Sequence, residues 1–254
     1  MKVIALQSGS NGNCIYVESK GVRLLFDAGI SGKQAQSRLA AHGRDIADVD
    51  ALVISHDHRD HVRCMGIYQR KFGLPIHTTK ETLAAAQRSN ALGPLNDVRH
   101  FASGAILRFG SVTVETIPTP HDAVDGVAFV VDDGTKRLGI LTDLGHPFDQ
   151  LISVMQTLDA VVLESNYDPE MLTVGPYPEF LQERIRGTGG HLSNFESAEL
   201  ICGVNGKLRW ACLAHLSEEN NDPDLAVDTH RDILGKRFPL IVASRHGATD
   251  VLEV

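Results

Sequence analysis

Residues 55–61 concentrate three imidazoles and two carboxylates in one short segment after an apolar run. Neutral imidazole and carboxylate oxygen are both common ligands of divalent cations. Donors at four close positions cannot comfortably all reach one ion. A tight loop could instead direct His56 and His58 to one cation, and Asp60 and His61 to another. The order and density of these side chains therefore predict a two-metal site rather than a solvated polar loop.

Other residues of metal-binding type stand where predicted strands end. Asp143 and His215 directly follow apolar runs, and Glu164 closes another. Catalytic residues in layered α/β proteins commonly sit at the carboxyl ends of strands, where the rigid scaffold meets a loop. We therefore expect these side chains to gather near the 55–61 segment.

The motif His-x-His-x-Asp-His after a hydrophobic strand resembles the signature of the metallo-β-lactamase superfamily, and three further motifs follow in the same order. The resemblance covers nearly the whole chain. It implies an α/β fold, the αβ/βα four-layer sandwich with two mixed β-sheets flanked by helices. It also implies a ligand set, with His56, His58 and His121 on one cation, Asp60, His61 and His215 on the other, and Asp143 between them.

Segments 8–13, 190–194 and 215–221 resemble one branch of this superfamily, the WalJ/YycJ branch, whose members are described as DNA exonucleases. This resemblance implies a dinuclear metal-dependent hydrolase, a phosphodiesterase acting as a 5′→3′ DNA exonuclease through a hydroxide that bridges the metals. Zn, Mn or Fe would suit the His and Asp donors. Arg59 stands where the family usually has Ser, and its role is left open.

Glu164 and His191 form a second candidate pair. In the related tRNA 3′-processing nucleases, a glutamate at a strand end works with a later histidine to protonate the leaving group, and these two residues match in order and context. An imidazolium held by a carboxylate is a suitable proton donor at neutral pH. We therefore predict Asp60, Glu164 and His191 as catalytic residues. The alternative is that Glu164 is a structural partner and His191 merely precedes a helix.

Segment 8–13 contains two glycines among small polar residues, and its backbone N–H groups could cradle a phosphate oxygen. The same composition is typical of an ordinary β-turn, so both readings stay open. The segment lacks the lysine and the spacing of a P-loop, which argues against a nucleotide cofactor. Ser193 precedes a predicted helix, where capping is favoured over substrate contact. The candidate substrate-binding residues are Ser8, Ser10, Asn11, Asn13 and Ser193.

The bulk composition is that of an ordinary globular protein, with 43% hydrophobic and 22% charged residues. The net charge of −8 argues against a broad DNA clamp, although bound dications can invert the local field at a phosphodiester site. Four cysteines without a Cys-x-x-Cys pair, no signal-peptide core and no transmembrane run predict a cytoplasmic protein with no membrane contact. The oligomeric state is left open.

Apolar runs and helix-like stretches alternate without a long linker, which predicts one domain over residues 1–254. The predicted strands are 3–6, 14–18, 22–27, 51–55, 112–117, 127–132, 138–142, 160–164, 209–214 and 239–243. The predicted helices are 33–42, 65–72, 80–89, 148–158, 193–203 and 223–234.

Three rival functions remain at this stage. A small-molecule phosphodiesterase, such as one acting on cyclic phosphates, would use the same site, and the acidic net charge favours it slightly. A thioesterase or lactamase-type hydrolase would use the metals but has no need of the Glu164–His191 pair. A non-enzymatic DNA-binding protein is of another class, and the intact donor set argues against it.

Overall fold

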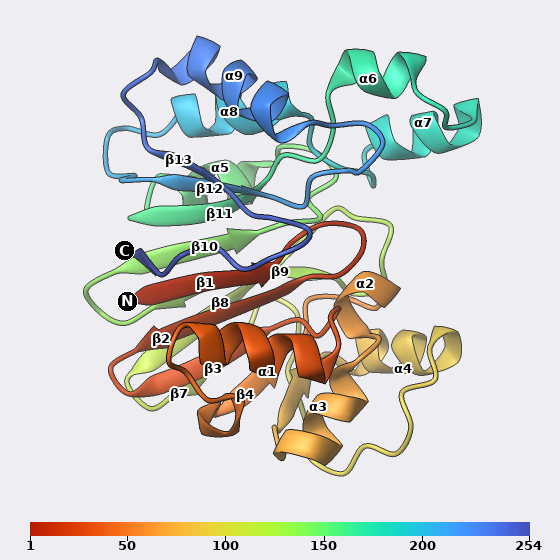
Figure 1. The fold of residues 1–254 in the computed structure, drawn as a ribbon, viewed down its shortest axis with the longest axis vertical. Helices are drawn as coiled ribbons and strands as arrows, with labels where there is room; N and C mark the ends of the chain where they lie inside the picture. The colour runs from red at the N-terminus through yellow and green to blue at the C-terminus, as the bar shows by residue number, and fades with distance from the viewer.

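Two seven-stranded sheets lie face to face at the centre of the computed structural model, which describes residues 1–254 (Figure 1). The first sheet has the spatial order β14 (Leu252–Glu253), β1 (Lys2–Gln7), β2 (Cys14–Ser19), β3 (Val22–Phe26), β4 (Ala51–Val53), β5 (Ile76–Thr78) and β6 (Val98–His100). The second has the order β13 (Leu240–Val242), β12 (Ala211–Ala214), β11 (Ala160–Glu164), β10 (Arg137–Leu141), β9 (Val127–Asp132), β8 (Val112–Pro118) and β7 (Ile106–Phe109).

Both sheets are mixed, and each divides into an antiparallel and a parallel part. In the first sheet, β14, β1, β2 and β3 pair antiparallel, whereas β3 to β6 run parallel. In the second sheet, β7 to β10 are antiparallel, whereas β10 to β13 run parallel. Parallel strands end at the same edge of a sheet, so the polar residues that follow them are brought to one side of the molecule.

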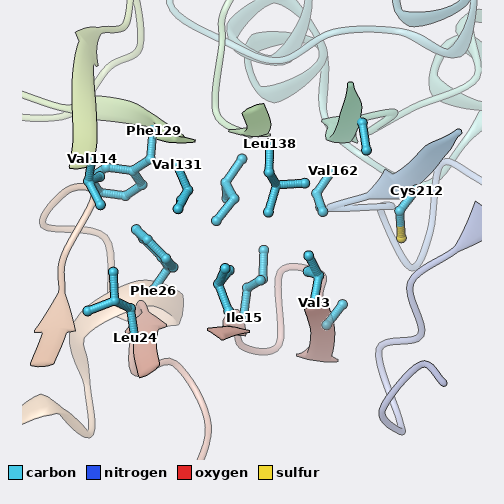
Figure 2. Close-up of a cluster of buried hydrophobic side chains, with 14 of the residues drawn as sticks. Val3, Ile15, Leu24, Phe26, Val114, Phe129, Val131, Leu138, Val162 and Cys212 are labelled. Atoms are coloured by element: carbon cyan, nitrogen blue, oxygen red, sulfur yellow. The ribbon is translucent and has the colours of Figure 1, made fainter. Parts of the chain in front are cut away.

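The alternation of side chains along each strand divides the core into layers. On β1, Val3 and Ala5 point into the space between the sheets, whereas Ile4 and Leu6 point outward under the helices. Figure 2 shows the inter-sheet layer, in which Phe26 faces Phe129 with 5.0 Å between the ring centroids. Strands that are buried on both faces need continuously apolar sequences, and this explains the apolar runs of the chain.

Helices cover the outer faces of both sheets (Figure 1). The first sheet is covered by α1 (Gly32–Ala41), α3 (Met65–Phe72) and α4 (Lys80–Ser89), with the short η1 (Ile46–Asp48) nearby. The second sheet is covered by α5 (Asp149–Met155), α8 (Asn194–Cys202) and α9 (Pro223–Leu234). Three short helices complete the chain, α2 (Arg59–Val62), α6 (Pro169–Val174) and α7 (Glu179–Arg186). No helix combines the length and apolar character that a bilayer crossing requires.

The predicted fold class, an αβ/βα four-layer sandwich, is confirmed, but several elements were missed. Strands β5, β6 and β7 escaped notice because they have three or four residues each and mix polar with apolar side chains. Helices α6 and α7 were not among the predicted helices. Yet Asp168 caps α6, with Pro169 at its first position, which is a recognisable helix-start signal.

Candidate metal centre

All seven predicted donors meet at one edge of the two sheets. The 55–61 segment follows β4, His121 follows β8, Asp143 follows β10 and His215 follows β12. The structure therefore brings together side chains that are up to 159 positions apart in the sequence. Four groups have candidate ligand atoms within 4.8 Å of one another: His56, His58 and His121; His56, His61 and Asp143; Asp60, His61 and His215; and Asp143, Glu164, His191 and His215.

The contacts divide most of these donors into two sets. In the first set, Nδ1 of His58 lies 3.2 Å from Nε2 of His121. In the second set, Oδ2 of Asp60 lies 3.3 Å from Nε2 of His61 and 3.4 Å from Nε2 of His215. Each of these sets of converging nitrogen and oxygen atoms has the donor chemistry to hold a divalent cation.

Asp143 connects the two sets. Its Oδ2 lies 3.4 Å from Nε2 of His61, and its Oδ1 lies 3.7 Å from Nε2 of His121. Burial alone would raise the pKa of Asp143, but the imidazoles of His215 and His61 hold it well below the usual range, so the carboxylate stays ionised. It can therefore offer one oxygen to each side.

Two buried atoms at this centre have no hydrogen-bond partner, Nε2 of His56 and Oδ2 of Asp143. Buried polar atoms are nearly always paired, so each exception needs a physical explanation. His56 and Asp143 form, with His61, a group whose candidate ligand atoms lie within 4.8 Å of one another. A divalent cation at this place would satisfy both, and the donor set therefore fits the metal ions that the sequence predicts.

Hydrogen bonds on the outer side of the imidazoles aim their inner nitrogens at the centre. Asp27 accepts from Nδ1 of His61 at 2.7 Å and from the hydroxyl of Ser55 at 2.8 Å. Because that hydroxyl donates to Asp27, its oxygen is left to accept from Nδ1 of His56, at 2.9 Å. In the neutral rings that bind metals, both Nε2 atoms are then unprotonated and directed inward. Sequence reasoning missed Asp27 and Ser55, although Asp27 follows a buried strand like the predicted donors.

His121 is held in the same way by the backbone. Its Nδ1 donates to the carbonyl oxygen of Gly190 at 2.9 Å, which leaves Nε2 free to face the centre. A Cβ on Gly190 would lie 2.0 Å from the carbonyl oxygen of Ile185, so only glycine allows this close approach. The loop before His191 is thereby tied both to helix α7 and to a donor of the centre.

Backbone strain is concentrated at this centre. Asp27, Asp143 and His215 have φ angles of 62°, 58° and 57°, in the left-handed region that non-glycine residues seldom adopt. Such conformations cost free energy and persist where surrounding contacts fix them, often at functional sites. Here they turn the side chains of three strand ends toward one another.

The structure places the predicted acid pair in direct contact. Nδ1 of His191 donates to Oε1 of Glu164 at 2.8 Å, and Nδ1 of His215 lies 3.0 Å from the same oxygen. Glu164 is fully buried and also accepts from the backbone N–H groups of Leu144 and Leu192. Burial alone would raise the pKa of Glu164, but the two imidazoles lower it to about 2, so it remains a carboxylate.

The 8–13 segment supports the centre from outside. Nδ2 of Asn13 lies 3.1 Å from Oδ2 of Asp60 and 3.0 Å from Nε2 of His61, and its backbone N–H donates to the Asp60 carbonyl oxygen. Gly29 passes so closely behind this loop that a Cβ on it would lie 1.6 Å from the same carbonyl oxygen. Ser8 accepts from the backbone N–H of His215 at 2.9 Å. The segment therefore clamps donors from both sheets.

The five candidate substrate contacts have different positions. Ser8 and Asn13 are buried in the bonds just described, and Asn11 donates to the carbonyl oxygen of Arg245. Ser193 caps α8 in a capping box with Glu196, which agrees with the capping alternative. Ser10 is the one member of the five that lines the cleft over the donors.

A cleft of about 340 Å³ opens over the donors. One wall carries polar and metal-binding side chains, and the other comes from helix α7 and the turn before it, which were not among the predicted elements. The cleft is lined by Ser10, His58, Arg59, Asp60, Asp143, Asn166, Tyr177, Leu181, Arg184, Ile185, His191, His215 and Ser217.

Comparison with known proteins agrees with this arrangement. Residues 22–215 match the family described as the Beta-lactamase superfamily domain. The chain is 36% identical to exodeoxyribonuclease WalJ of Streptococcus pneumoniae serotype 2, over 89% of this chain and 85% of that protein. It is 33% identical to exodeoxyribonuclease YycJ of Bacillus anthracis, over 87% of this chain and 84% of that protein.

A solved structure shares the fold at lower sequence identity. The metallo-β-lactamase fold protein YhfI of Bacillus subtilis superposes with a TM-score of 0.74 at 18% identity, and 98% of each chain is covered. Together, the four-layer fold, the donor motifs in register and the sequence identities show that the chain belongs to the metallo-β-lactamase superfamily of metal-dependent hydrolases and, within it, to the family of the WalJ and YycJ exodeoxyribonucleases.

Proposed function

We propose that this protein is a phosphodiesterase with two divalent cations that degrades DNA from a strand end, in the 5′→3′ direction. Three observations support this proposal: the two donor sets joined by Asp143, the identity to relatives named exodeoxyribonucleases, and the Glu164–His191 pair beside the donors. The pair carries most weight, because a phosphodiester releases an alkoxide that needs a proton.

The proposed ligand set follows from the contacts. One cation would be held by Nε2 of His56, Nδ1 of His58 and Nε2 of His121. The other would be held by Asp60 and by Nε2 of His61 and of His215, with Asp143 shared by both. When bound, such cations supply Lewis-acid polarisation of a phosphoryl oxygen and lower the pKa of water toward neutrality.

We propose that His191 is the general acid. Its Nδ1 is occupied by Glu164, and its ring lines the cleft, so Nε2 is the nitrogen that can reach the substrate. As water oxygen bonds to phosphorus and the bond from phosphorus to the leaving oxygen breaks, Nε2–H gives its proton to that oxygen. The buried carboxylate of Glu164 orients the ring and stabilises the imidazolium before this transfer.

We also propose that residues 1–254 form one domain. The inter-sheet cluster takes Val3, Ile15 and Phe26 from the first sheet and Phe129, Val162 and other side chains from the second. Each half of the chain would leave this apolar face uncovered if it folded alone, which supports a single cooperative unit.

A substrate panel tests the proposed function. The protein would be reconstituted separately with Zn²⁺, Mn²⁺ and Fe²⁺, and assayed on bis-p-nitrophenyl phosphate, cyclic nucleotides, end-labelled single-stranded and duplex DNA, RNA and a thioester. We expect stepwise release of mononucleotides from DNA and hydrolysis of the small phosphodiester. Rapid cleavage of cyclic nucleotides with no DNA degradation would contradict the exonuclease assignment, and preference for the thioester would contradict phosphodiester chemistry altogether.

A further inference from the structure

The wall of the cleft opposite the donors is apolar and aromatic. Leu181 and Ile185 lie four residues apart on one face of α7, and Tyr177, in the turn before the helix, lines the same cleft. They pack with the buried side chains of Tyr167 and Leu172 into a small separate cluster. This wall offers little to a phosphate group, yet it is part of the same cleft as His191 and Asp143.

The surface beside this wall has the composition of a single-strand binding surface. Phe180 is 72% exposed, and its helical position places it next to the cleft-facing Arg184. Across the cleft, the guanidinium of Arg59 is exposed and makes no hydrogen bond or ion pair within the protein. Arg184 is ion-paired with Asp122, so Arg59 is the free cation of this surface. Single-stranded nucleic acid is bound by such a combination of aromatic faces for bases and cations for phosphates.

The dimensions of the cleft limit what can bind there. Its volume of about 340 Å³ lies at the lower end of the range of roughly 300–1,000 Å³ that is typical of small-ligand pockets. A single nucleotide is a ligand of this class, so a phosphodiester at the donors would place one neighbouring base in the same cleft.

We propose that the face of Tyr177, Leu181 and Ile185 is a nucleobase site, with the Tyr177 ring stacked on the base next to the scissile phosphate and Arg59 on a neighbouring phosphate. The inference rests on the proposed phosphodiesterase function and specifies its substrate: a DNA end whose terminal nucleotide is unpaired. A duplex end must fray before it is cleaved, since a base enters the cleft only after it has left its partner.

A cycle of protein and substrate changes tests the stacking. Single-turnover cleavage would be measured on single strands that carry either a base or an abasic tetrahydrofuran residue, placed in turn on each side of the scissile bond. On one side of the scissile bond, the abasic residue should lower the cleavage rate of wild-type protein about 5- to 150-fold, which corresponds to about 1–3 kcal/mol per stacked base. Tyr177→Ala should lower the cleavage rate of the normal strand by a similar factor. On the abasic strand, the variant should cleave as fast as wild-type protein does.

Matched variants separate stacking from shape. Tyr177→Phe keeps an aromatic face and should preserve the discrimination, whereas Tyr177→Leu keeps apolar volume and should lose it. Phe195 is also half exposed but does not line the cleft, so Phe195→Ala should behave as wild type. Arg59→Ala should still discriminate fully between normal and abasic strands. It should reduce the slope of the logarithm of the DNA-binding constant against the logarithm of salt concentration by about one.

The outcomes distinguish two failures. If wild-type protein cleaves normal and abasic strands equally, or Tyr177→Ala slows both strands and bis-p-nitrophenyl phosphate equally, the nucleobase site is wrong while the phosphodiesterase stands. If no DNA strand and no small phosphodiester is cleaved with any metal, the proposed function itself falls and the inference falls with it. Faster cleavage of a blunt duplex than of a single-stranded end would also overturn the unpaired-end requirement.

Discussion

The donor cluster and the α7 wall face each other across one cleft, and they are built in opposite ways. His56, His61 and His215 are buried, and each is held on its outer side by a carboxylate, a hydroxyl or both. In the wall, Tyr177 and Leu181 are only partly covered and pack on a cluster of three buried residues. Catalysis requires donors fixed to a fraction of an ångström, whereas base stacking tolerates adjustment. Substitutions in the donor cluster should therefore abolish activity, whereas substitutions in the wall should reduce it only in part.

Removing the shared carboxylate should have the largest effect. Asp143→Ala takes one oxygen from each proposed cation, so both metals and the activity should be lost together. Residues that only support metal ligands cost about 10- to 100-fold when changed, so activity should fall well below 1% of wild type. Elemental analysis and bis-p-nitrophenyl phosphate hydrolysis measure the two losses. Retention of two metals with normal turnover would show that Asp143 does not connect the sites.

Crowding the loop behind the donors should damage the same region without removing any donor. The Cβ of Gly29→Ala would lie 1.6 Å from the Asp60 carbonyl oxygen, a backbone atom that cannot move freely. Destabilisation by about 1–3 kcal/mol is expected, with weakened metal retention. Gly247→Ala is the matched control, because its Cβ would meet open space. Thermal unfolding with and without metal compares the two, and a wild-type result for Gly29→Ala would contradict the rigid clamp.

Removing the proposed acid should separate chemistry from metal binding. His191 is outside both proposed ligand sets, so His191→Ala should keep both metals and lower kcat on DNA by roughly 10²–10⁴-fold. The loss should shrink for p-nitrophenyl esters, whose leaving group departs without a proton. Glu164→Gln should give a smaller defect of the same kind. Equal impairment of activated and natural esters, or loss of a metal, would remove the acid role from His191.

Loosening the wall should give a graded effect. Leu172 is fully buried in the small cluster beneath α6 and α7, and Leu172→Ala should destabilise that cluster by about 2–5 kcal/mol. We expect faster proteolysis within residues 169–190 and a KM for DNA that rises about tenfold, within the 1–3 kcal/mol that one stacked base contributes, while metal content stays unchanged. Val174→Ala, in the same helix but 77% exposed, is the control. Loss of metal in Leu172→Ala would show that the two regions are not independent.

The smallest effect on stability is expected from a substitution at Asp133, in a turn outside both the donor cluster and the wall. Burial would raise the pKa of Asp133, but hydrogen bonds from Ser19, Thr135 and Lys136 lower it below the usual range. A lowered folded pKa gives stability that is present above the unfolded pKa of about 3.9 and is lost as the pH falls through the folded pKa.

Asp133→Asn should therefore lower the free energy of unfolding by about 1 kcal/mol at pH 7, and the difference from wild type should narrow below about pH 4. Urea unfolding at several pH values measures this difference, and metal content and kinetics should stay as in wild type. If the difference in free energy of unfolding widened as the pH fell, the pKa of Asp133 would not be lowered in the folded protein.

The donors could be predicted without the structure, because their residue types and motifs are local. The 55–61 segment, Asp143 and His215 stand next to apolar strands, and a buried strand fixes where its end must lie. The family motifs then predicted the four-layer sandwich, which the structure confirms. The pairing of Glu164 with His191 was predicted from the resemblance to the tRNA 3′-processing nucleases, and the two side chains are in contact.

The residues that support and face those donors could be identified only in the folded chain. Asp27 lies 34 positions from His61 and has no motif of its own, so only the folded chain reveals their 2.7 Å contact. The wall formed by α7 and the turn before it could not be predicted from the sequence for a similar reason. Leu181 and Ile185 have the spacing of an ordinary amphipathic helix, which indicates burial but not what packs against the buried face. Their position opposite His191 depends on long-range packing that no local pattern encodes.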